Sequence, residues 1–407
     1  MSTPLDDEPK TLLVTLTGKD RPGVTSAMFA ALAAAGVEVV DIEQIVLRRR
    51  LVLGILVTAP RDWKKLRDVI VRTAADLDMQ VEVDRGAGDN RSRAGDRSHI
   101  TIIGKPLLAS AMAAIAGRIA DSGANIDKIE RMARYPVTAI ELHVSGAPAD
   151  RLRPLLAAEA VKQGIDLAVQ RDSLHRRGIR LIVMDVDSTL IQGEVIEMIA
   201  AHAGQEDEVA RVTEAAMRGE LDFEESLRER VALLEGVPAS ALDEVYDSIE
   251  LAPGARTMVR TLRRLGYRFA IVSGGFSQIT DRLAADLGIH FARANELEIV
   301  DGRLTGRIVG DVVDRAGKAE ALRGFAAEVG IDVSAVIAIG DGANDLDMLN
   351  AAGLGIAYNA KQMVRDAADT AVNVPYLDAI MYLLGISREE IVAADAEAGI
   401  VTPAPPV

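Results

Sequence analysis

Two aspartates, Asp185 and Asp187, follow a short apolar stretch, residues 180–184, that is typical of a buried strand. The chain turns where such a strand ends, so both carboxylates can point into one cavity. Ligands of open α/β sheets bind at the carboxyl ends of the strands. One aspartate at this place can attack an electrophile and hold a metal ion, while the other moves protons.

Three further segments that could do chemistry are expected to converge with this one at the carboxyl ends of the predicted strands. Ser273 precedes two glycines whose backbone amides can face an anion, Lys318 ends the segment 314–318, and Asp341 lies in the acidic loop 340–345. A nucleophilic carboxylate, an acid/base carboxylate, a hydroxyl, an ammonium and a second acid together suit phosphoryl transfer through an aspartyl-phosphate. Several carboxylates packed together also need a divalent cation.

The elements that would position these residues alternate between strand and helix from residue 180 onward. This alternation predicts a doubly wound parallel sheet, an α/β fold, over residues 178–395. A helical insertion at about 195–250 follows the first strand and is expected to fold over the carboxylates as a cap. The strands are expected at 180–184, 268–272, 335–339 and 354–357.

An internal repeat fills the sequence before this half. Gly18 in the first copy matches Gly104 in the second, about 86 residues later. Each copy has the element order βαββαβ, which predicts two ferredoxin-like domains at 9–86 and 98–172. The segment 85–98, rich in Gly, Arg, Asp and Ser, is expected to link them.

The two copies resemble ACT domains, which sense small molecules and accompany enzymes of amino-acid metabolism. The likeness rests on residues 18–23 (Gly-Lys-Asp-Arg-Pro-Gly) and, in the second copy, on residues 123–126 (Gly-Ala-Asn-Ile); the second copy lacks the Asp-x-Pro-Gly element. The resemblance implies that an amino acid binds at a seam between domains or subunits, near Gly18, Asp20 and Asn125. A turn and a helix cap would also account for the glycines and the proline.

The second half, from about Gly178 to Leu384, resembles the haloacid-dehalogenase-like phosphatase superfamily and, within it, the phosphoserine phosphatases. The four segments described above carry the likeness to the superfamily. The narrower likeness rests on the cap segment 217–230 with Glu194, and on the later hairpin 295–306. The resemblance implies Mg²⁺-dependent hydrolysis of O-phospho-L-serine to L-serine and phosphate, the last step of L-serine biosynthesis.

The resemblance also implies a role for each catalytic residue. Asp185 would attack phosphorus, and Asp187 would protonate the departing serine oxygen and then take a proton from water. Asp185, the backbone carbonyl of Asp187 and Asp341 would hold Mg²⁺, while Asp345 would tune the metal without binding it. The phosphate would be held or positioned by Ser273, the Gly274 amide, Lys318 and Asn344.

Four residues of the cap region are expected to select the substrate. Glu194 would meet the α-ammonium and Arg230 the α-carboxylate, in charge-assisted contacts. Met217 and Phe223 would form an apolar lid that excludes water. Two plainer interpretations stay open: the lid residues could be cap core, and Glu194 and Arg230 could pair with each other.

Composition restricts the class of protein. The chain of 407 residues has a net charge of −15, which argues against a general binder of nucleic acid or acidic membranes. It has no cysteine, which excludes disulfides and thiolate metal sites. No apolar stretch approaches the ~20 residues of a membrane span. We therefore expect a cytoplasmic protein. The resemblance to ACT domains implies a homodimer that is regulated by an amino acid, with L-serine as the candidate effector.

Other functions also fit the pattern. The same fold could act on another phosphomonoester or move phosphate to another acceptor. The chain could also be an ACT-type sensor with a degenerate catalytic half, although intact Asp187 and Lys318 argue against that. A phosphoprotein phosphatase is disfavoured, because the cap should exclude macromolecules.

Overall fold

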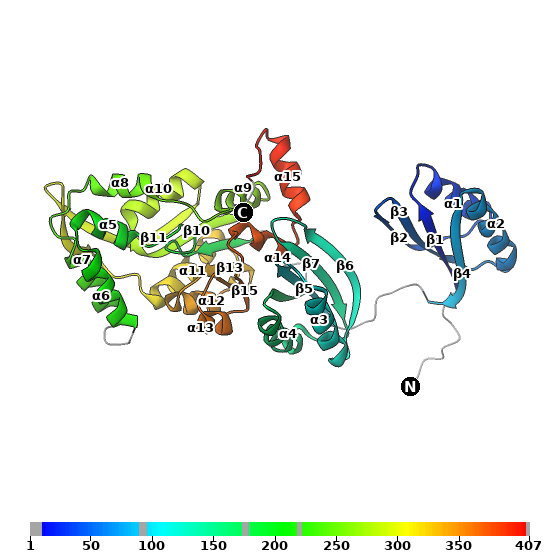
Figure 1. Ribbon diagram of the computed structural model, residues 1–407, viewed down its shortest axis with the longest axis horizontal. Coiled ribbons are helices and arrows are strands. Elements are labelled where there is room, and N and C mark those ends of the chain that lie inside the picture. The colour runs from blue at the N-terminus through cyan, green and yellow to red at the C-terminus, as the bar shows by residue number, and fades with distance from the viewer. Residues whose placement is uncertain (1–9, 89–95, 173–177, 179, 218–221, 404–407) are drawn as a thin grey trace. The chain divides into compact units, whose positions relative to one another are not determined.

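The computed structural model describes residues 10–88, 96–172, 178, 180–217 and 222–403 (Figure 1). The chain divides into two compact units, the first ending at Ala94 and the second beginning at Gly95. Among the described residues, no helix combines the length and the apolar character that crossing a membrane requires. Residues 89–95, half of the predicted linker 85–98, lie outside the described residues.

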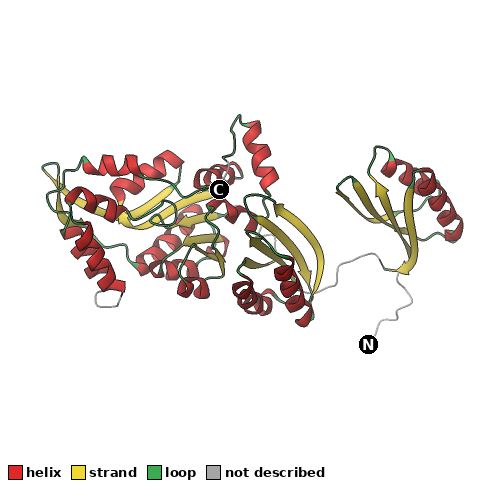
Figure 2. Cartoon of the chain, viewed as in Figure 1, coloured by secondary structure: helices red, strands yellow, loops and turns green. Residues whose placement is uncertain are grey.

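The first unit is a four-stranded antiparallel sheet with both helices packed on one face (Figure 2). Side chains of a strand alternate between faces, so Leu12, Val14 and Leu16 all point toward the helices and are fully buried. The sheet order is β2-β3-β1-β4, which is the predicted ferredoxin-like arrangement. The elements are β1 (Lys10–Lys19), α1 (Val24–Ala33), β2 (Val39–Leu47), β3 (Arg50–Thr58), α2 (Trp63–Asp76) and β4 (Met79–Ala87).

The second unit begins with the other repeat, whose sheet order β6-β7-β5-β8 matches the first. It is joined to the catalytic half by hydrogen bonds. Thr370 Oγ1 donates to the Leu167 carbonyl at 2.8 Å, and the Asp166 carboxylate accepts from the backbone N–H and the side-chain amide of Asn373. The elements are β5 (Arg97–Gly104), α3 (Ala109–Asp121), β6 (Asn125–Ala133), β7 (Thr138–Ser145), α4 (Ala149–Gln163) and β8 (Asp166–Arg171).

The catalytic half is built on a seven-stranded sheet in the order β12-β11-β10-β9-β13-β14-β15. All neighbours pair in parallel except β11 and β12, which form an antiparallel hairpin. β9 lies between β10 and β13, so the chain reverses its direction of winding there, where such sheets bind ligands. The strands are β9 (Leu181–Met184), β10 (Arg268–Phe276), β11 (Phe291–Val300), β12 (Arg303–Val309), β13 (Val336–Gly340), β14 (Leu354–Tyr358) and β15 (Thr370–Val372).

Both faces of this sheet are covered, as a parallel sheet requires. Ile182 and Met184 of β9 pack toward α9 and α10, while Leu181 and Val183 pack toward α11, α12 and α13. The helices are α9 (Ala255–Arg264), α10 (Ser277–Leu287), α11 (Arg315–Val329), α12 (Leu346–Ala351), α13 (Gln362–Ala367), α14 (Ile380–Leu383) and α15 (Arg388–Glu397), with 3-10 turns at Val333–Ala335, Ala343–Asp345 and Leu377–Ala379.

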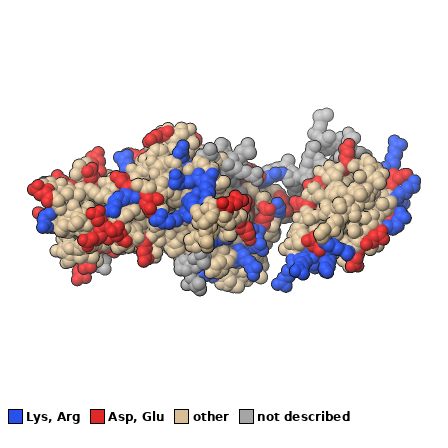
Figure 3. Space-filling view, turned by 90° about the horizontal axis from the view of Figure 1, so that it is seen from above, with Lys and Arg blue, Asp and Glu red and all other residues tan. Residues whose placement is uncertain are grey.

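The predicted cap is helical. Its helices are α5 (Val195–Ala203), α6 (Glu206–Met217), α7 (Phe223–Ala232) and α8 (Ala241–Ser248). The predicted fold class, two ferredoxin-like domains before a doubly wound sheet with a helical cap, is therefore confirmed. On the face drawn in Figure 3, acidic and basic side chains are interspersed.

Candidate active site

A tight turn at the end of β9 carries Asp185 and Asp187 into one site. The backbone N–H groups of Thr189, Leu190 and Ile191 all donate to the carbonyl of Val186, which closes the turn directly after the strand. The Asp185 backbone N–H donates to Ile339 in β13 at 2.9 Å, so the nucleophile candidate is still fixed to the sheet. The turn therefore brings both predicted carboxylates to the carboxyl edge of the sheet.

Lys318, near the start of α11, is fully buried between two carboxylates. Its Nζ lies 2.8 Å from Asp185 Oδ1 and 2.7 Å from Asp345 Oδ1. Burial acts to lower the pKa of Lys318, but the two carboxylates offset burial and raise the pKa above its usual value. Burial and the charge of Asp345 raise the pKa of Asp185 well above its usual range, against the attraction of Lys318. The lysine is thus a permanent cation beside the nucleophile candidate.

Asp187 is held separately by the strand next to it and by the cap. Its Oδ2 accepts from Ser273 Oγ at 2.9 Å, and its Oδ1 accepts from the Val195 backbone N–H at 2.8 Å, where α5 begins. Burial raises the pKa of Asp187, against these two hydrogen bonds. A β-carbon at Gly275 would lie 2.9 Å from both Asp187 Oδ2 and Ser273 Oγ, so a glycine is needed beside this pair.

We use the term catalytic cluster for Asp185, Asp341 and Asp345, whose carboxylate oxygens lie within 4.8 Å of one another. Burial raises the pKa of Asp341 to about 6, although Thr189 Oγ1 donates to it at 2.7 Å. Buried carboxylates that favour protons are suited to a divalent cation, and a donor set of oxygens alone fits Mg²⁺. The residues therefore fit the predicted metal, and a carbonyl contribution from Asp187 stays a prediction.

Asp345 has a larger part in this arrangement than we predicted from the sequence. Its carboxylate accepts from Lys318 and from the Gly342 backbone N–H, at 2.7 and 3.0 Å. The chain folds back closely enough that a β-carbon at Gly340 would lie 2.4 Å from Asp345 Oδ2. The glycine at position 340 is required by this close approach, but the glycine alone does not predict which side chain approaches it.

Glu194 lies at the start of α5, at the junction between the cap and the sheet. Its Oε1 accepts from Ser188 Oγ at 2.8 Å. Burial, together with the charge of Asp187, raises the pKa of Glu194 to about 7. A carboxylate that is costly to ionise without a partner is well suited to meet an ammonium group.

The helix α7 presents Phe223 and Arg230 on the cap. Asp222 caps the helix through a reciprocal pair of hydrogen bonds with Glu225, so Phe223 is the first helical residue. Phe223 comes so close to Gly274 that a β-carbon there would lie 3.0 Å from its Cζ. Arg230 is half-buried, and burial lowers its pKa against the attraction of Glu194 and Asp187. The side chain of Met217, at the end of α6, lies outside the described residues.

The phosphate-binding candidates come from three segments, and Asn295 links two of them. Asn295 Nδ2 donates to the Gly274 carbonyl, and its Oδ1 accepts from the Val313 backbone N–H, each at 2.7 Å. This links the end of β10, which carries Ser273 and Gly274, to the segment before Lys318. Asn344 is half-buried in the 3-10 turn beside Asp341. The sequence showed Asn295 only as part of the predicted hairpin, without this function.

The predicted effector residues fall in different units. Gly18 lies in β1, where a β-carbon would meet Met79 Sδ, and Asp20 follows that strand, its backbone N–H bonded to the Arg49 carbonyl. Asn125 begins β6 in the second unit, and its side-chain amide donates to Asp127 Oδ1 at 2.9 Å. Asp20 and Asn125 are exposed. A shared effector site stays a prediction.

Comparison with known protein families agrees with this architecture. A model of haloacid dehalogenase-like hydrolases matches residues 182–350, and two ACT-domain models match residues 10–84 and 97–170. The chain is 60% identical over 397 residues to a phosphoserine phosphatase of Streptomyces coelicolor, covering 97% of each chain. It is 51% identical over 390 residues to the phosphoserine phosphatase SerB2 of Mycobacterium tuberculosis, covering 95% of each.

Two solved structures share the fold. The unliganded probable phosphoserine phosphatase of Vibrio cholerae has a TM-score of 0.57 and 34% sequence identity, over 74% of this chain and 88% of that chain. A HAD family hydrolase of Salmonella enterica has a TM-score of 0.62 and 28% identity, over 70% of this chain and 98% of that chain. Each likeness covers more than two thirds of this chain.

Proposed function

Because the chain belongs to the phosphoserine phosphatases of the haloacid dehalogenase-like hydrolases, we propose that it hydrolyses O-phospho-L-serine through an aspartyl-phosphate on Asp185. The observation that carries this proposal is the position of Lys318, buried with its Nζ 2.8 Å from Asp185. A buried ammonium at that distance lowers the cost of bringing a phosphate dianion to a carboxylate nucleophile. Membership of this enzyme family also sets aside the alternative of a degenerate sensor.

The proposed reaction has two steps. A carboxylate oxygen of Asp185 attacks phosphorus, and the serine oxygen leaves with a proton from Asp187. Water then attacks the phosphorus of the aspartyl-phosphate and gives a proton back to Asp187, which restores the Asp185 carboxylate and releases phosphate. Burial raises the pKa of Asp187, which favours the protonated form that the first step needs. Ser273 keeps this carboxyl oriented through its 2.9 Å hydrogen bond.

Asp185, Asp341 and the backbone carbonyl of Asp187 would hold Mg²⁺, and Asp345 would tune the metal without binding it. When bound, the ion supplies positive charge that offsets the charge of the phosphoryl group. Lys318 pairs with Asp185 and Asp345, and Ser273 and the Gly274 amide would complete the surroundings of the phosphoryl oxygens. Asn344 would position phosphate or Lys318.

Selection of phosphoserine would depend on the junction between cap and sheet. We assign Glu194 to the α-ammonium. The pKa of Glu194 is raised to about 7, so a neighbouring cation would stabilise its ionised form. Arg230 would pair with the α-carboxylate, and its half-burial would strengthen that pair relative to one in water. Phe223, together with Met217, would close the apolar lid over the site.

The first test is phosphate release from O-phospho-L-serine by wild type and Asp185→Asn, with and without Mg²⁺. We expect turnover only with the metal, and a loss of about 10⁴-fold or more in the variant, because the nucleophile is gone. Asp243→Asn is the matched control, since Asp243 is exposed in α8 and pairs with Arg282. A wild type that ignores phosphoserine but hydrolyses another phosphomonoester would contradict the substrate assignment.

The two ACT domains support regulation by an amino acid, and we propose L-serine, the product, as the effector near Gly18, Asp20 and Asn125. Binding there would shift the cap or the subunit equilibrium. Calorimetry with serine on Asp185→Asn, compared with Asp185→Asn carrying Asp20→Ala, tests the site. Weaker binding in the double variant is expected, and unchanged binding would place the effector elsewhere.

We also propose a homodimer, with a cytoplasmic location remaining a prediction from the sequence. The support is the sheet of the first unit, which exposes large apolar side chains such as Val39, Ile42 and Leu47, the last at 64%. Sedimentation of the full chain should show a dimer that Ile42→Glu dissociates. Val161→Glu, at an exposed apolar position in α4, is the control, and equal sedimentation of both variants would contradict this interface.

A further inference from the structure

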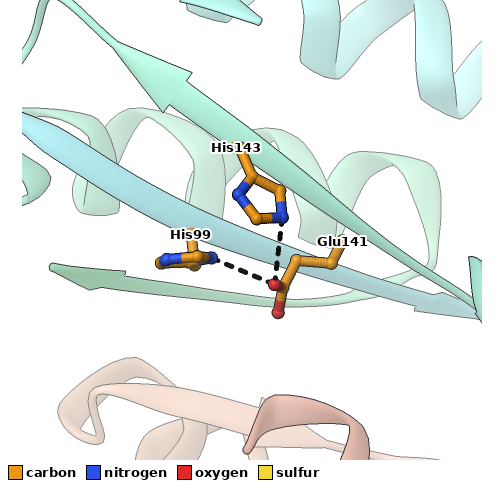
Figure 4. A group of neighbouring side chains, drawn as sticks. All are labelled: His99, Glu141 and His143. Carbon is orange, nitrogen blue, oxygen red and sulfur yellow. Dashed lines mark hydrogen bonds and ion pairs between the residues drawn. The ribbon is translucent and has the colours of Figure 1, made fainter. Parts of the chain in front are cut away.

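The second ACT domain carries a group of side chains that the proposed reaction does not use. His99 of β5 lies directly opposite His143 of β7, and Glu141 is two residues along β7 on the same face. We call these three residues the histidine cluster. Figure 4 shows both imidazole rings turned toward the carboxylate of Glu141.

The three donor atoms have the spacing of ligands to one metal ion. His99 Nδ1 lies 3.0 Å and His143 Nε2 lies 3.4 Å from the same oxygen, Glu141 Oε1. One possible ligand atom from each of the three residues lies within 4.8 Å of the others. A tetrahedral ion with bonds of about 2.0–2.1 Å keeps its ligand atoms about 3.3–3.4 Å apart. The two nitrogen–oxygen distances are therefore already close to that arrangement.

The second nitrogen of His99 shows how the ring would be oriented. His99 Nε2 lies 3.3 Å from Asp172 Oδ1, and its side chain is only 7% exposed. A neutral imidazole has one N–H and cannot donate to Glu141 and Asp172 together. If a metal ion takes Nδ1, the single N–H on Nε2 can donate to Asp172, which is the carboxylate contact that metal-binding histidines ordinarily make.

The charged groups around the histidine cluster favour a divalent cation. His143 Nε2 also lies 3.1 Å from Glu130 Oε2, and Lys128 Nζ lies 2.7 Å from the other oxygen of Glu130. The carboxylates of Glu130, Glu141 and Asp172 carry three negative charges, and Lys128 carries one positive charge. Counted by themselves, these four groups carry a charge of −2, the sign that attracts a divalent cation.

We propose that His99, Glu141 and His143 bind a divalent transition-metal ion, Zn²⁺ in preference to Mg²⁺. Imidazole nitrogen suits Zn²⁺ and its neighbours in the first transition row, whereas Mg²⁺ requires oxygen ligands. His143 is 30% exposed, which gives the ion an access path from solvent. The ion ties β5 to β7 and, through Asp172, to the residue that follows β8. It is separate from the metal of the catalytic cluster.

The test uses the full chain, stripped with EDTA and then kept in excess Mg²⁺, which occupies the oxygen ligands of the catalytic cluster. Titration with Co²⁺ should give the strong visible absorption of a tetrahedral site with nitrogen ligands, and Zn²⁺ should displace the Co²⁺. His143→Gln should weaken Co²⁺ binding at least about 100-fold, because it removes a ligand. His202→Gln is the matched control: His202 is an exposed histidine of α5, and this variant should bind Co²⁺ as wild type does.

A second variant keeps the test conclusive if His143→Gln fails to fold. Asp172→Asn keeps all three ligands and should weaken binding by about 10–100-fold, since it alters only the partner of His99. Circular dichroism of each variant checks the fold. Undiminished Co²⁺ absorption in His143→Gln, or a wild type with only the weak absorption of oxygen-bound Co²⁺, would overturn the proposal. The contacts within the histidine cluster would then be hydrogen bonds without a metal ion.

Discussion

The catalytic cluster and the histidine cluster both bury negative charge, but they compensate for it in different ways. Beside the catalytic cluster, the ammonium of Lys318 is fully buried and lies 2.7 and 2.8 Å from two carboxylates. Beside the histidine cluster, the half-exposed ammonium of Lys128 pairs with Glu130, which is itself partly exposed. The first site is thus kept partly neutral by the chain itself, whereas we infer that the second depends on an ion from solution.

The donor atoms give the second contrast. The catalytic cluster offers carboxylate oxygens alone, while the histidine cluster offers two imidazole nitrogens and one carboxylate. Oxygen ligands favour Mg²⁺, and imidazole nitrogens favour Zn²⁺. One chain can therefore separate a metal needed for chemistry from a metal that holds a sheet together, and the following changes test that separation.

Lys318→Met should have the largest effect. Removing one partner of a buried ion pair leaves two carboxylates without compensation, so we expect the free energy of unfolding to fall by about 3–5 kcal/mol. Phosphatase activity should be lost with it. Lys128→Met should change the unfolding free energy by less than about 1 kcal/mol, because its pair is exposed. Urea titration measures both, and equal losses would remove the contrast between the clusters.

Glu194→Gln should show a clear pH dependence. The pKa of Glu194 is raised to about 7 in the folded state, so the folded state binds a proton that the unfolded state releases near its ordinary pKa. Wild-type stability should therefore fall as the pH rises from about 4.5 to about 7, by roughly 3 kcal/mol relative to Glu194→Gln. Urea titration in EDTA at about pH 5 and about pH 8 measures this difference. The exposed neighbour variant Glu197→Gln should follow wild type at both values, and a flat difference for Glu194→Gln would contradict the assignment.

Arg230→Ala should impair phosphoserine hydrolysis selectively. Losing a charge-assisted contact to the substrate carboxylate should raise KM for phosphoserine by about 10–100-fold. O-phosphoethanolamine has no carboxylate, so its KM should hardly change. Arg228→Ala is the control, because Arg228 is exposed and pairs with Glu224 on the cap. Equal effects on the two substrates would contradict the proposed role of Arg230.

The catalytic cluster was largely predictable because its residues stand where strands end. A buried apolar stretch followed by polar residues is a local pattern, and parallel strands bring their carboxyl ends together without further information. Asp185 and Asp341 could therefore be assigned to one site from the sequence alone. The contacts of Asn295 and Asp345 could not, because they depend on how closely two loops approach each other.

The histidine cluster could not be predicted from the sequence, because the register between two strands creates it. Glu141 and His143 visibly share one face of a strand, but His99 lies 42 residues before Glu141. Only the pairing of β5 with β7 places His99 opposite His143. The attachment of the second repeat to the catalytic half was unpredictable for a related reason: it depends on β15, which is only three residues long.

Thr101→Val should have the smallest effect of these changes. It tests whether Thr101 interacts with the metal site proposed at the histidine cluster. Thr101 lies opposite Glu141 in β5 and is fully buried, and its hydroxyl makes no hydrogen bond to the described residues. Valine removes this unsatisfied group, so the metal-free protein should gain up to about 1 kcal/mol in unfolding free energy. With Zn²⁺ the gain should shrink, since the hydroxyl can bond to water on the ion. Thr280→Val, at another buried and unpaired hydroxyl in α10, should gain equally with and without Zn²⁺. Thermal unfolding of both variants in EDTA and in Zn²⁺ makes the comparison, and a Zn²⁺-independent gain for Thr101→Val would separate this residue from the proposed metal site.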